Sequence, residues 1–191
     1  MHNKRVKFAP FGRPTRKSEA LLLAAYARRY AERERVEQIV ELDVGCVPEA
    51  AVSGPVLLQT DYSAVLTFNA MRKSESGEYL DAGTAVVEFE ICSVTKFGYP
   101  NDEAWSGIPR TRGLSYGFYE VLDSTWKAEL EQLNRHSFPE TKEWNGRHFI
   151  ILFHDSSFEC IARDFKIETS HERYEDLWVR VYQRALRYAA A

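Results

Sequence analysis

Two short stretches of the 191-residue chain hold the residues best suited to chemistry. Residues 97–105 read FGYPNDEAW and contain two adjacent carboxylates, Asp102 and Glu103. A later stretch, HFIILFHDSSFEC, places His154 beside Asp155 and two serines. A histidine near a carboxylate can act as a general acid or base, or can activate a nucleophile. The candidate catalytic residues are therefore His154, Asp102 and Glu103.

Both stretches also have a purely structural interpretation. Asn101 or Asp102 can cap a short helix, and Glu103 suits its first turn. Asp155 can form an Asx turn at the end of a strand. Consecutive strand residues point to opposite faces, so His154 and Asp155 pair poorly unless the turn bends.

We expect the loop 98–105 to lie against the turn 154–157 and to form the main concavity of the protein. Four more residues there are candidate ligand contacts: Tyr99, Asn101, Asp155 and Arg112. The chain has no metal-ligand spacing, phosphate loop or dinucleotide fingerprint, so we predict neither a metal nor a cofactor. His148 and His154 would stand about 20 Å apart on one strand face, too far to share a metal.

The elements that must position these residues are mostly strands. Segments 62–70 and 84–97 alternate in polarity on either side of a polar loop, which is typical of a hairpin. The predicted core-facing side chains are Phe68, Val87 and Phe89. Segments 147–153 and 158–167 predict a second hairpin.

Helical patterns lie toward the ends of the chain and between the hairpins. We expect helices over 19–36, after a cap at Asp123 or Ser124, and from Thr169 to about Ala190. Strands and helices do not alternate as βαβ units, which indicates the α+β class. The prediction is a single domain with a curved, mainly antiparallel sheet of about five to seven strands, packed with N- and C-terminal helices.

Charge divides the chain into a basic N-terminal arm, 1–17, and an α+β domain, 18–191. The arm has six basic residues and no acidic one, within a formal net charge of −3. Such an arm suits nucleic acid, but terminal segments are more often solvated tails, so nucleic acid is an unlikely partner. The apolar run 20–27 is far shorter than the ~20 residues of a membrane span. Three widely spaced cysteines suggest reduced thiols and a cytoplasmic location.

Three segments together are similar to a known group. The stretches FGYPNDEA, GLSYGFYEVLDSTW and RHFIILFHDSSFECIA resemble a group of small uncharacterised bacterial proteins with no known activity. The resemblance covers about residues 84–165 and implies a bacterial, cytosolic setting. It also implies a site at 97–105 and 148–160. The group often has a histidine before a proline where this chain has Ile108-Pro109, so any role of that histidine does not transfer.

Three functions follow from these residues. The first is a non-catalytic protein that binds an unknown small molecule or protein partner. The second is a metal-independent hydrolase or transferase with its site at the 98–105 loop and the 154–157 turn. The third is nucleic-acid association through the arm. A deep pocket lined by Tyr99, Asp102, Glu103 and His154 would favour the enzyme.

Overall fold

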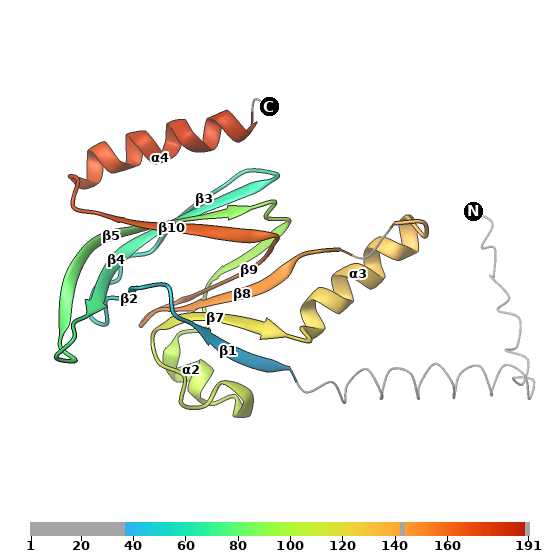
Figure 1. The fold of residues 1–191 in the computed structure, drawn as a ribbon. Helices are drawn as coiled ribbons and strands as arrows, with labels where there is room; N and C mark the ends of the chain where they lie inside the picture. Colours follow the sequence, from blue (N-terminus) through green and yellow to red (C-terminus); the bar gives the residue numbers. More distant parts are fainter. Residues whose placement is uncertain (1–36, 142–143, 190–191) are drawn as a thin grey trace, which may run out of the picture. The chain divides into compact units, whose positions relative to one another are not determined.

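The structure is a computed structural model that describes residues 37–141 and 144–189 (Figure 1). The described residues belong to one compact unit. The predicted basic arm and the predicted helix over 19–36 lie outside the described residues.

Ten strands form two five-stranded sheets, and every strand pair of the described chain is antiparallel. The first sheet has the order β1 (Gln38–Leu42), β7 (Gly117–Leu122), β8 (Arg147–Leu152), β9 (Ser157–Ala162) and β6 (Val94–Gly98). The second has the order β10 (Asp164–Ser170), β5 (Tyr79–Glu90), β4 (Ser63–Lys73) and β2 (Val47–Pro48), with β3 (Val56–Gln59) also paired to β4.

The helices of the described residues are α2 (Asp102–Ser106), α3 (Thr125–Ser137) and α4 (Tyr174–Ala189), with a 3-10 turn at Pro109–Thr111. The predicted α+β class is confirmed. The strands divide between two sheets, where the sequence suggested one curved sheet. Among the helices of the described chain, none is long and apolar enough to cross a membrane.

The main core lies between the two sheets and is rich in phenylalanine. Phe89 of the second sheet lies 5.1 Å from Phe158 and 6.0 Å from Phe149 of the first, measured between ring centroids. Phe68 packs on Phe153 in the same way, at 5.4 Å. The predicted pairing of the two central segments is confirmed, since β4 and β5 pair antiparallel with Phe89 fully buried.

Both long predicted strands change sheet part of the way along. The segment 84–97 breaks after Glu90, where Ile91 has a φ of 49°, and continues as β6 in the first sheet. The segment 158–167 breaks at Arg163 and continues as β10 in the second sheet. The core-facing positions shift by one residue at each break. Ala85, Val87 and Phe89 are followed by Cys92, and Phe158, Cys160 and Ala162 are followed by Phe165 and Ile167. Both segments stay rich in apolar residues through the break and therefore resemble single strands in the sequence.

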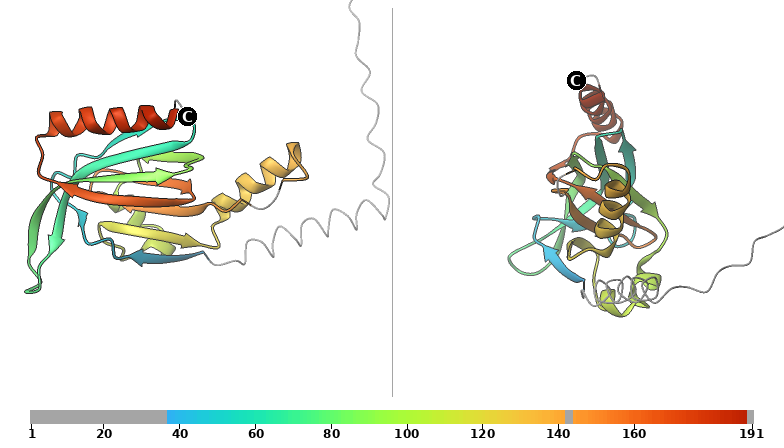
Figure 2. Two further views of the ribbon diagram at one scale, coloured as in Figure 1. Left: turned by 45° about the horizontal axis from the view of Figure 1, so that its top comes forward. Right: turned by 90° about the vertical axis from the view of Figure 1, so that its right-hand side faces the viewer.

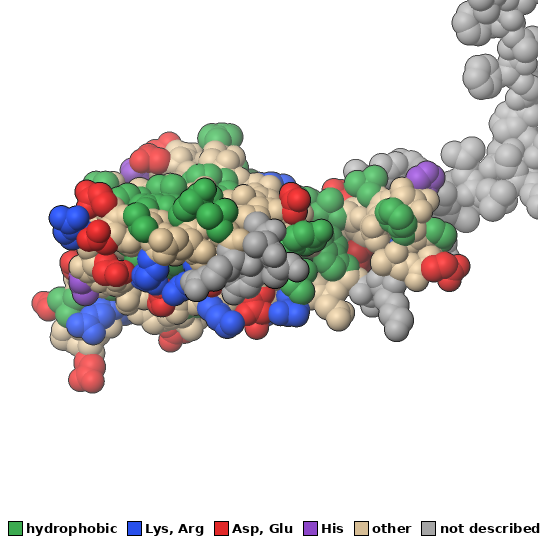
Figure 3. Space-filling model, turned by 90° about the horizontal axis from the view of Figure 1, so that it is seen from above, with side chains coloured by type: hydrophobic (Ala, Val, Ile, Leu, Met, Phe, Trp, Pro, Cys, Tyr) green, Lys and Arg blue, Asp and Glu red, His purple; other side chains and the backbone are tan. Residues whose placement is uncertain are grey.

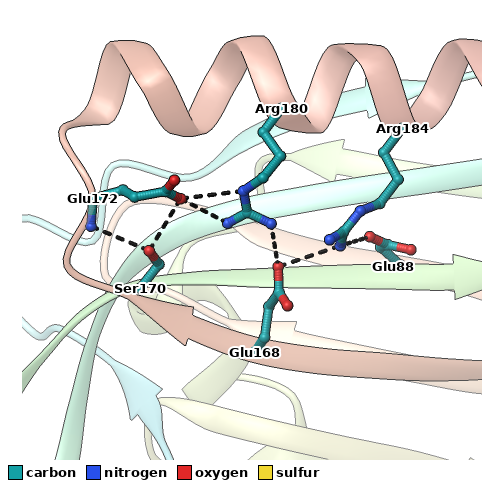
Figure 4. Close-up of polar contacts among 6 residues, drawn as sticks. All are labelled: Glu88, Glu168, Ser170, Glu172, Arg180 and Arg184. Carbon is teal, nitrogen blue, oxygen red and sulfur yellow. Dashed lines mark hydrogen bonds and ion pairs between the residues drawn. The ribbon is translucent and has the colours of Figure 1, made fainter.

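The outer face of the second sheet is covered by α4 (Figures 1 and 2). Leu177 and Val181 pack with Val65 and Val86 of the sheet. Beside this contact, ion pairs hold the helix to the sheet and to the segment before the helix (Figure 4). Arg180 binds Glu168 at 2.6 Å and Glu172 at 2.9 Å, and Arg184 binds Glu88 and Glu168.

The opposite side of α4 is apolar and open to solvent. Hydrophobic side chains gather on this side of the molecule when it is seen from above (Figure 3). Four of the exposed hydrophobic residues belong to α4: Tyr174, Val179, Tyr182 and Leu186. The apolar residues of this helix are thus only partly buried.

Candidate functional site

Short helix α2 brings the first candidate stretch onto the outer face of the first sheet. Its N-cap is Asn101, whose Oδ1 accepts a hydrogen bond from Ala104 N at 3.2 Å. Trp105 is buried and packs with Ile150 and Leu152 of β8. This packing fixes the start of α2 against the turn between β8 and β9.

Asp102 and His154 meet at that point, together with Tyr116. The Tyr116 hydroxyl donates to Asp102 Oδ2 at 2.7 Å, and His154 Nδ1 lies 3.2 Å from the same oxygen. Tyr116 Oη lies 3.1 Å from His154 Nδ1, and Asp102 N donates to the main-chain oxygen of His154 at 3.3 Å. We call Asp102, Tyr116 and His154 the acid–histidine cluster.

The hydrogen bonds fix how protons are arranged in the acid–histidine cluster. Because Tyr116 gives its proton to Asp102, its oxygen is left as an acceptor. His154 therefore carries a proton on Nδ1, shared between the carboxylate and the phenol oxygen. Its other nitrogen, Nε2, has no hydrogen-bond partner among the residues that the structure describes. That nitrogen can donate when the ring is charged and accept when the ring is neutral.

Electrostatics favour the charged form of His154. The hydrogen bond that His154 donates to Asp102 raises the pKa of His154, as does the negative charge of Asp102, and Asp155 and Glu103 add to the effect. The Tyr116 hydrogen bond, followed by the contact with His154, lowers the pKa of Asp102. The hydrogen bond to Asp102 raises the pKa of Tyr116. These shifts favour the imidazolium form of His154 and the carboxylate form of Asp102.

The remaining predicted residues surround this cluster or lie apart from it. Glu103 and Asp155 are exposed and act on His154 through their charges. Tyr99 is 83 % exposed. Arg112 is exposed, and within the described residues no hydrogen bond or ion pair joins it to the cluster.

The cluster is open to solvent on one side. The side chain of His154 is 49 % exposed and that of Asp102 is 27 % exposed. The predicted contact between the 98–105 loop and the 154–157 turn is present, but it makes an open surface. Tyr116 was not among the predicted site residues, because no local pattern marks a tyrosine that lies 38 positions from His154.

A second histidine cluster, also absent from the prediction, is buried at the other end of β8. His148 Nδ1 lies 2.8 Å from Ser124 Oγ, and His148 Nε2 lies 3.1 Å from Glu159 Oε2. The ring of Trp126 stands edge-on to His148 at 5.1 Å. Lys96 lies 3.7 Å from Glu159 Oε1, and its Nζ is 3.7 Å from the centroid of the Trp126 ring.

In this buried cluster a serine, a histidine and a carboxylate are hydrogen-bonded in series, as in many hydrolases. Their surroundings indicate that they stabilise the fold. Ser124 is the N-cap of α3, and its Oγ accepts a hydrogen bond from Lys127 N at 3.0 Å. Ser124, His148 and Glu159 are all buried. A nucleophilic serine needs an accessible oxygen. The Ser124 hydroxyl is instead buried and already hydrogen-bonded to Lys127 N and His148 Nδ1.

Metal and thiol chemistry have little support in this part of the chain. Within residues 37–141 and 144–189, no group of three or more His, Cys, Asp or Glu side chains could hold a metal ion. Burial raises the pKa of Cys46 to about 11, and burial also raises the pKa of Cys160. A thiol that stays protonated is a poor nucleophile.

The chain was compared with protein-family models, with curated proteins and with solved structures, and no match was found. A functional assignment therefore depends on the geometry of the acid–histidine cluster and its surroundings.

Proposed function

We propose that this protein is a non-catalytic binding protein whose partner contacts the surface around the acid–histidine cluster. The observation that carries the proposal is the state of His154. Its Nδ1 is held by Asp102 and Tyr116, whereas the ring is half exposed and its Nε2 has no partner in the described chain. A fixed, charged donor at an open surface suits recognition of a hydrogen-bond acceptor.

Local charge favours a neutral acceptor on a basic partner. Asp102, Glu103 and Asp155 supply three negative charges near the single positive charge of His154. A carboxylate would be repelled here, whereas a main-chain carbonyl flanked by cationic side chains would be attracted.

The neighbouring strand suits an extended peptide. β6 is the terminal strand of the first sheet, and its last residue, Gly98, pairs with Ser157 of β9. Phe97 and Tyr99, both exposed, therefore lie beside the turn that carries His154. Extended peptides bind such sheet edges through main-chain hydrogen bonds, and exposed aromatic residues add apolar contact. The partner class is thus an extended, basic peptide segment of a protein.

The second candidate function is a metal-independent hydrolase or transferase that uses His154 as its base. The contact between Asp102 and His154 favours it, because a carboxylate that orients a histidine is a common catalytic arrangement. Two observations weigh against it. The raised pKa favours the protonated form of His154, which cannot accept a proton, and the nearby Ser157 is buried.

Selection from a random peptide library, followed by affinity measurements, tests the binding proposal. We expect selected peptides to be rich in Lys and Arg and to bind His154→Gln about tenfold more weakly, which equals about 1.4 kcal/mol. His136→Gln, an exposed histidine on α3, is the matched control and should bind as the wild type does. Equal affinity for both variants would contradict the proposal. Turnover of nitrophenyl esters that His154→Gln abolishes would favour the hydrolase instead.

The resemblance of residues 84–165 to a group of small bacterial proteins stays a proposal, as does the bacterial, cytoplasmic setting that it implies. It supports this location for the site because two of the similar stretches contribute Asp102 and His154. Nucleic-acid association through residues 1–17 also stays a prediction, since the arm lies outside the described residues.

A further inference from the structure

The solvent side of α4 carries a continuous row of apolar side chains. Tyr174, Trp178, Tyr182 and Leu186 follow one another at intervals of four residues, and Val179 lies beside them. Side chains spaced by four form one ridge along a helix. Trp178 is partly buried, and the other four residues are 43 % to 58 % exposed. We call these five residues the α4 ridge.

The α4 ridge is a second apolar side of a helix that already has one. A surface helix normally has one apolar side and one polar side. In α4 the side toward the sheet is apolar, since Leu177 and Val181 pack on the second sheet. The cations of Arg180 and Arg184 are turned toward carboxylates of the sheet and of the segment before the helix (Figure 4). Two apolar sides are typical of a helix that is covered on both sides.

The charges around the α4 ridge suit a second copy of the chain. The ridge itself contains no charged residue. Glu175 and Asp176 lie in the first turn of the helix, and Asp176 is paired with Arg173. Two copies that cross antiparallel keep these acidic turns at opposite ends of the contact, so like charges do not meet.

The exposed area of the α4 ridge is sufficient for a weak dimer. Val, Leu and Tyr residues have about 150–220 Å² of surface each, so the four exposed residues leave roughly 380 Å² open to solvent. Two copies would bury about twice that area, and an apolar share of about 65 % would bring the whole interface to roughly 1,200 Å². Specific interfaces begin at about this size, and those at the lower limit belong to reversible complexes.

We propose that the α4 ridge is the contact surface of a homodimer, in which the ridge of each copy packs into the groove beside the ridge of the other. Helices that pack through rows of this spacing cross at about 50°. The contact lies on the outer side of the second sheet, whereas the acid–histidine cluster lies on the outer side of the first (Figure 1). A dimer therefore leaves both clusters accessible. The proposal is independent of the binding function, and either one can fail without the other.

Sedimentation velocity of the full chain over about 1–300 μM tests the proposal. We expect the average mass to rise reversibly with concentration from that of one chain toward that of two. A chain that stays monomeric throughout would overturn the proposal, and would leave another segment of the chain or another protein to cover the α4 ridge.

Two matched leucine variants locate the contact. Leu186→Glu places a carboxylate on the α4 ridge and should weaken dimerisation tenfold or more, because burying an unpaired charge is unfavourable. Leu133→Glu is the control, since Leu133 is 68 % exposed and lies, as Leu186 does, near the end of its helix. It should dimerise as the wild type does. Both leucines are exposed, so neither variant should lower the melting temperature by more than a few degrees.

A second ridge variant keeps the test decisive if Leu186→Glu does not fold. Tyr182→Ser removes the exposed ring at the middle of the α4 ridge and should also weaken dimerisation. Dimerisation of the ridge variants at wild-type strength, or an equal loss in Leu133→Glu, would overturn the proposal.

Discussion

Replacing Ser124 by alanine tests whether the buried histidine cluster stabilises the fold. Ser124 Oγ makes two hydrogen bonds, one as acceptor from Lys127 N at the start of α3 and one to His148 Nδ1. Because the oxygen already accepts from Lys127, its own proton is free for His148. His148 then keeps a proton on Nε2 for Glu159, so the whole chain of hydrogen bonds is satisfied.

The expected loss of unfolding free energy in Ser124→Ala is the sum of two lost hydrogen bonds. Loss of an N-cap side chain costs about 1 kcal/mol. His148 Nδ1 would also remain buried without a donor, which costs about 1–3 kcal/mol more. The sum, about 2–4 kcal/mol, corresponds to a fall in melting temperature of roughly 4–16 °C for a chain of this size. Urea unfolding at neutral pH measures the free energy directly.

Two further substitutions at the same position separate the two bonds. Ser124→Thr keeps the hydroxyl and should cost little. In Ser124→Gly, the lost N-cap lowers the free energy of unfolding by only a few tenths of a kcal/mol. Nearly all of the destabilisation of this variant therefore measures the lost hydrogen bond to His148. If Ser124→Gly is as stable as the wild type, His148 does not depend on this hydroxyl and the proposed chain of hydrogen bonds is wrong.

Three further predictions concern the His154 pairing, the packing of α4 and its ion pairs. Asp102→Asn should lower the pKa of His154 in an NMR titration, because Asp102 is the main cause of its raised value; an unchanged titration would contradict the pairing. Leu177→Ala should cost about 2–5 kcal/mol of unfolding free energy and the exposed Val179→Ala less than about 0.5, so equal losses would contradict the packing of α4. Arg180 lowers the pKa of Glu168 below its ordinary value of 4.5, so this pair stabilises the fold at neutral pH. The wild type should have a higher free energy of unfolding than Glu168→Gln at neutral pH, and this difference should shrink as the pH falls from about 4.5 through the lowered pKa of Glu168. A difference that does not change with pH would argue against the ion pair.

Local sequence patterns predicted the parts of the fold that depend on neighbours in the chain. The alternation of residues 62–70 fixes which side chains face the core, and the structure buries Phe68 accordingly. The cap at Ser124 follows from residue type alone, as does the start of α2 after Asn101. The contact between the 98–105 loop and the 154–157 turn was predicted for a reason that proved wrong. We expected Tyr99 and Trp105 to cover the strand face of Phe149, Ile151 and Phe153, but that face lies in the core between the sheets. Trp105 instead covers Ile150 and Leu152 on the opposite face.

Long-range features could not be read from those patterns. Ile91 and Arg163 mark the points where strands change sheet. The core-facing positions shift by only one residue at each point, and a shift of one residue is hard to recognise in a segment that stays apolar. Tyr116 reaches the acid–histidine cluster only through the three-dimensional path of the chain. The contact between His148 and Ser124 could not be predicted for the same reason, because Ser124 lies 24 positions away and on another element.

The position of α2 decides what the acid–histidine cluster can do. A helix of five residues is unstable alone in water, so α2 depends on the contacts of Trp105 with Ile150 and Leu152. These contacts cover the outer face of β8 beside the cluster. Asp102, at the start of the same helix, holds Nδ1 of His154 from that side. The open side of the imidazole faces solvent, where a partner surface can reach it but where water is not excluded. Recognition of a partner therefore fits the cluster better than catalysis does.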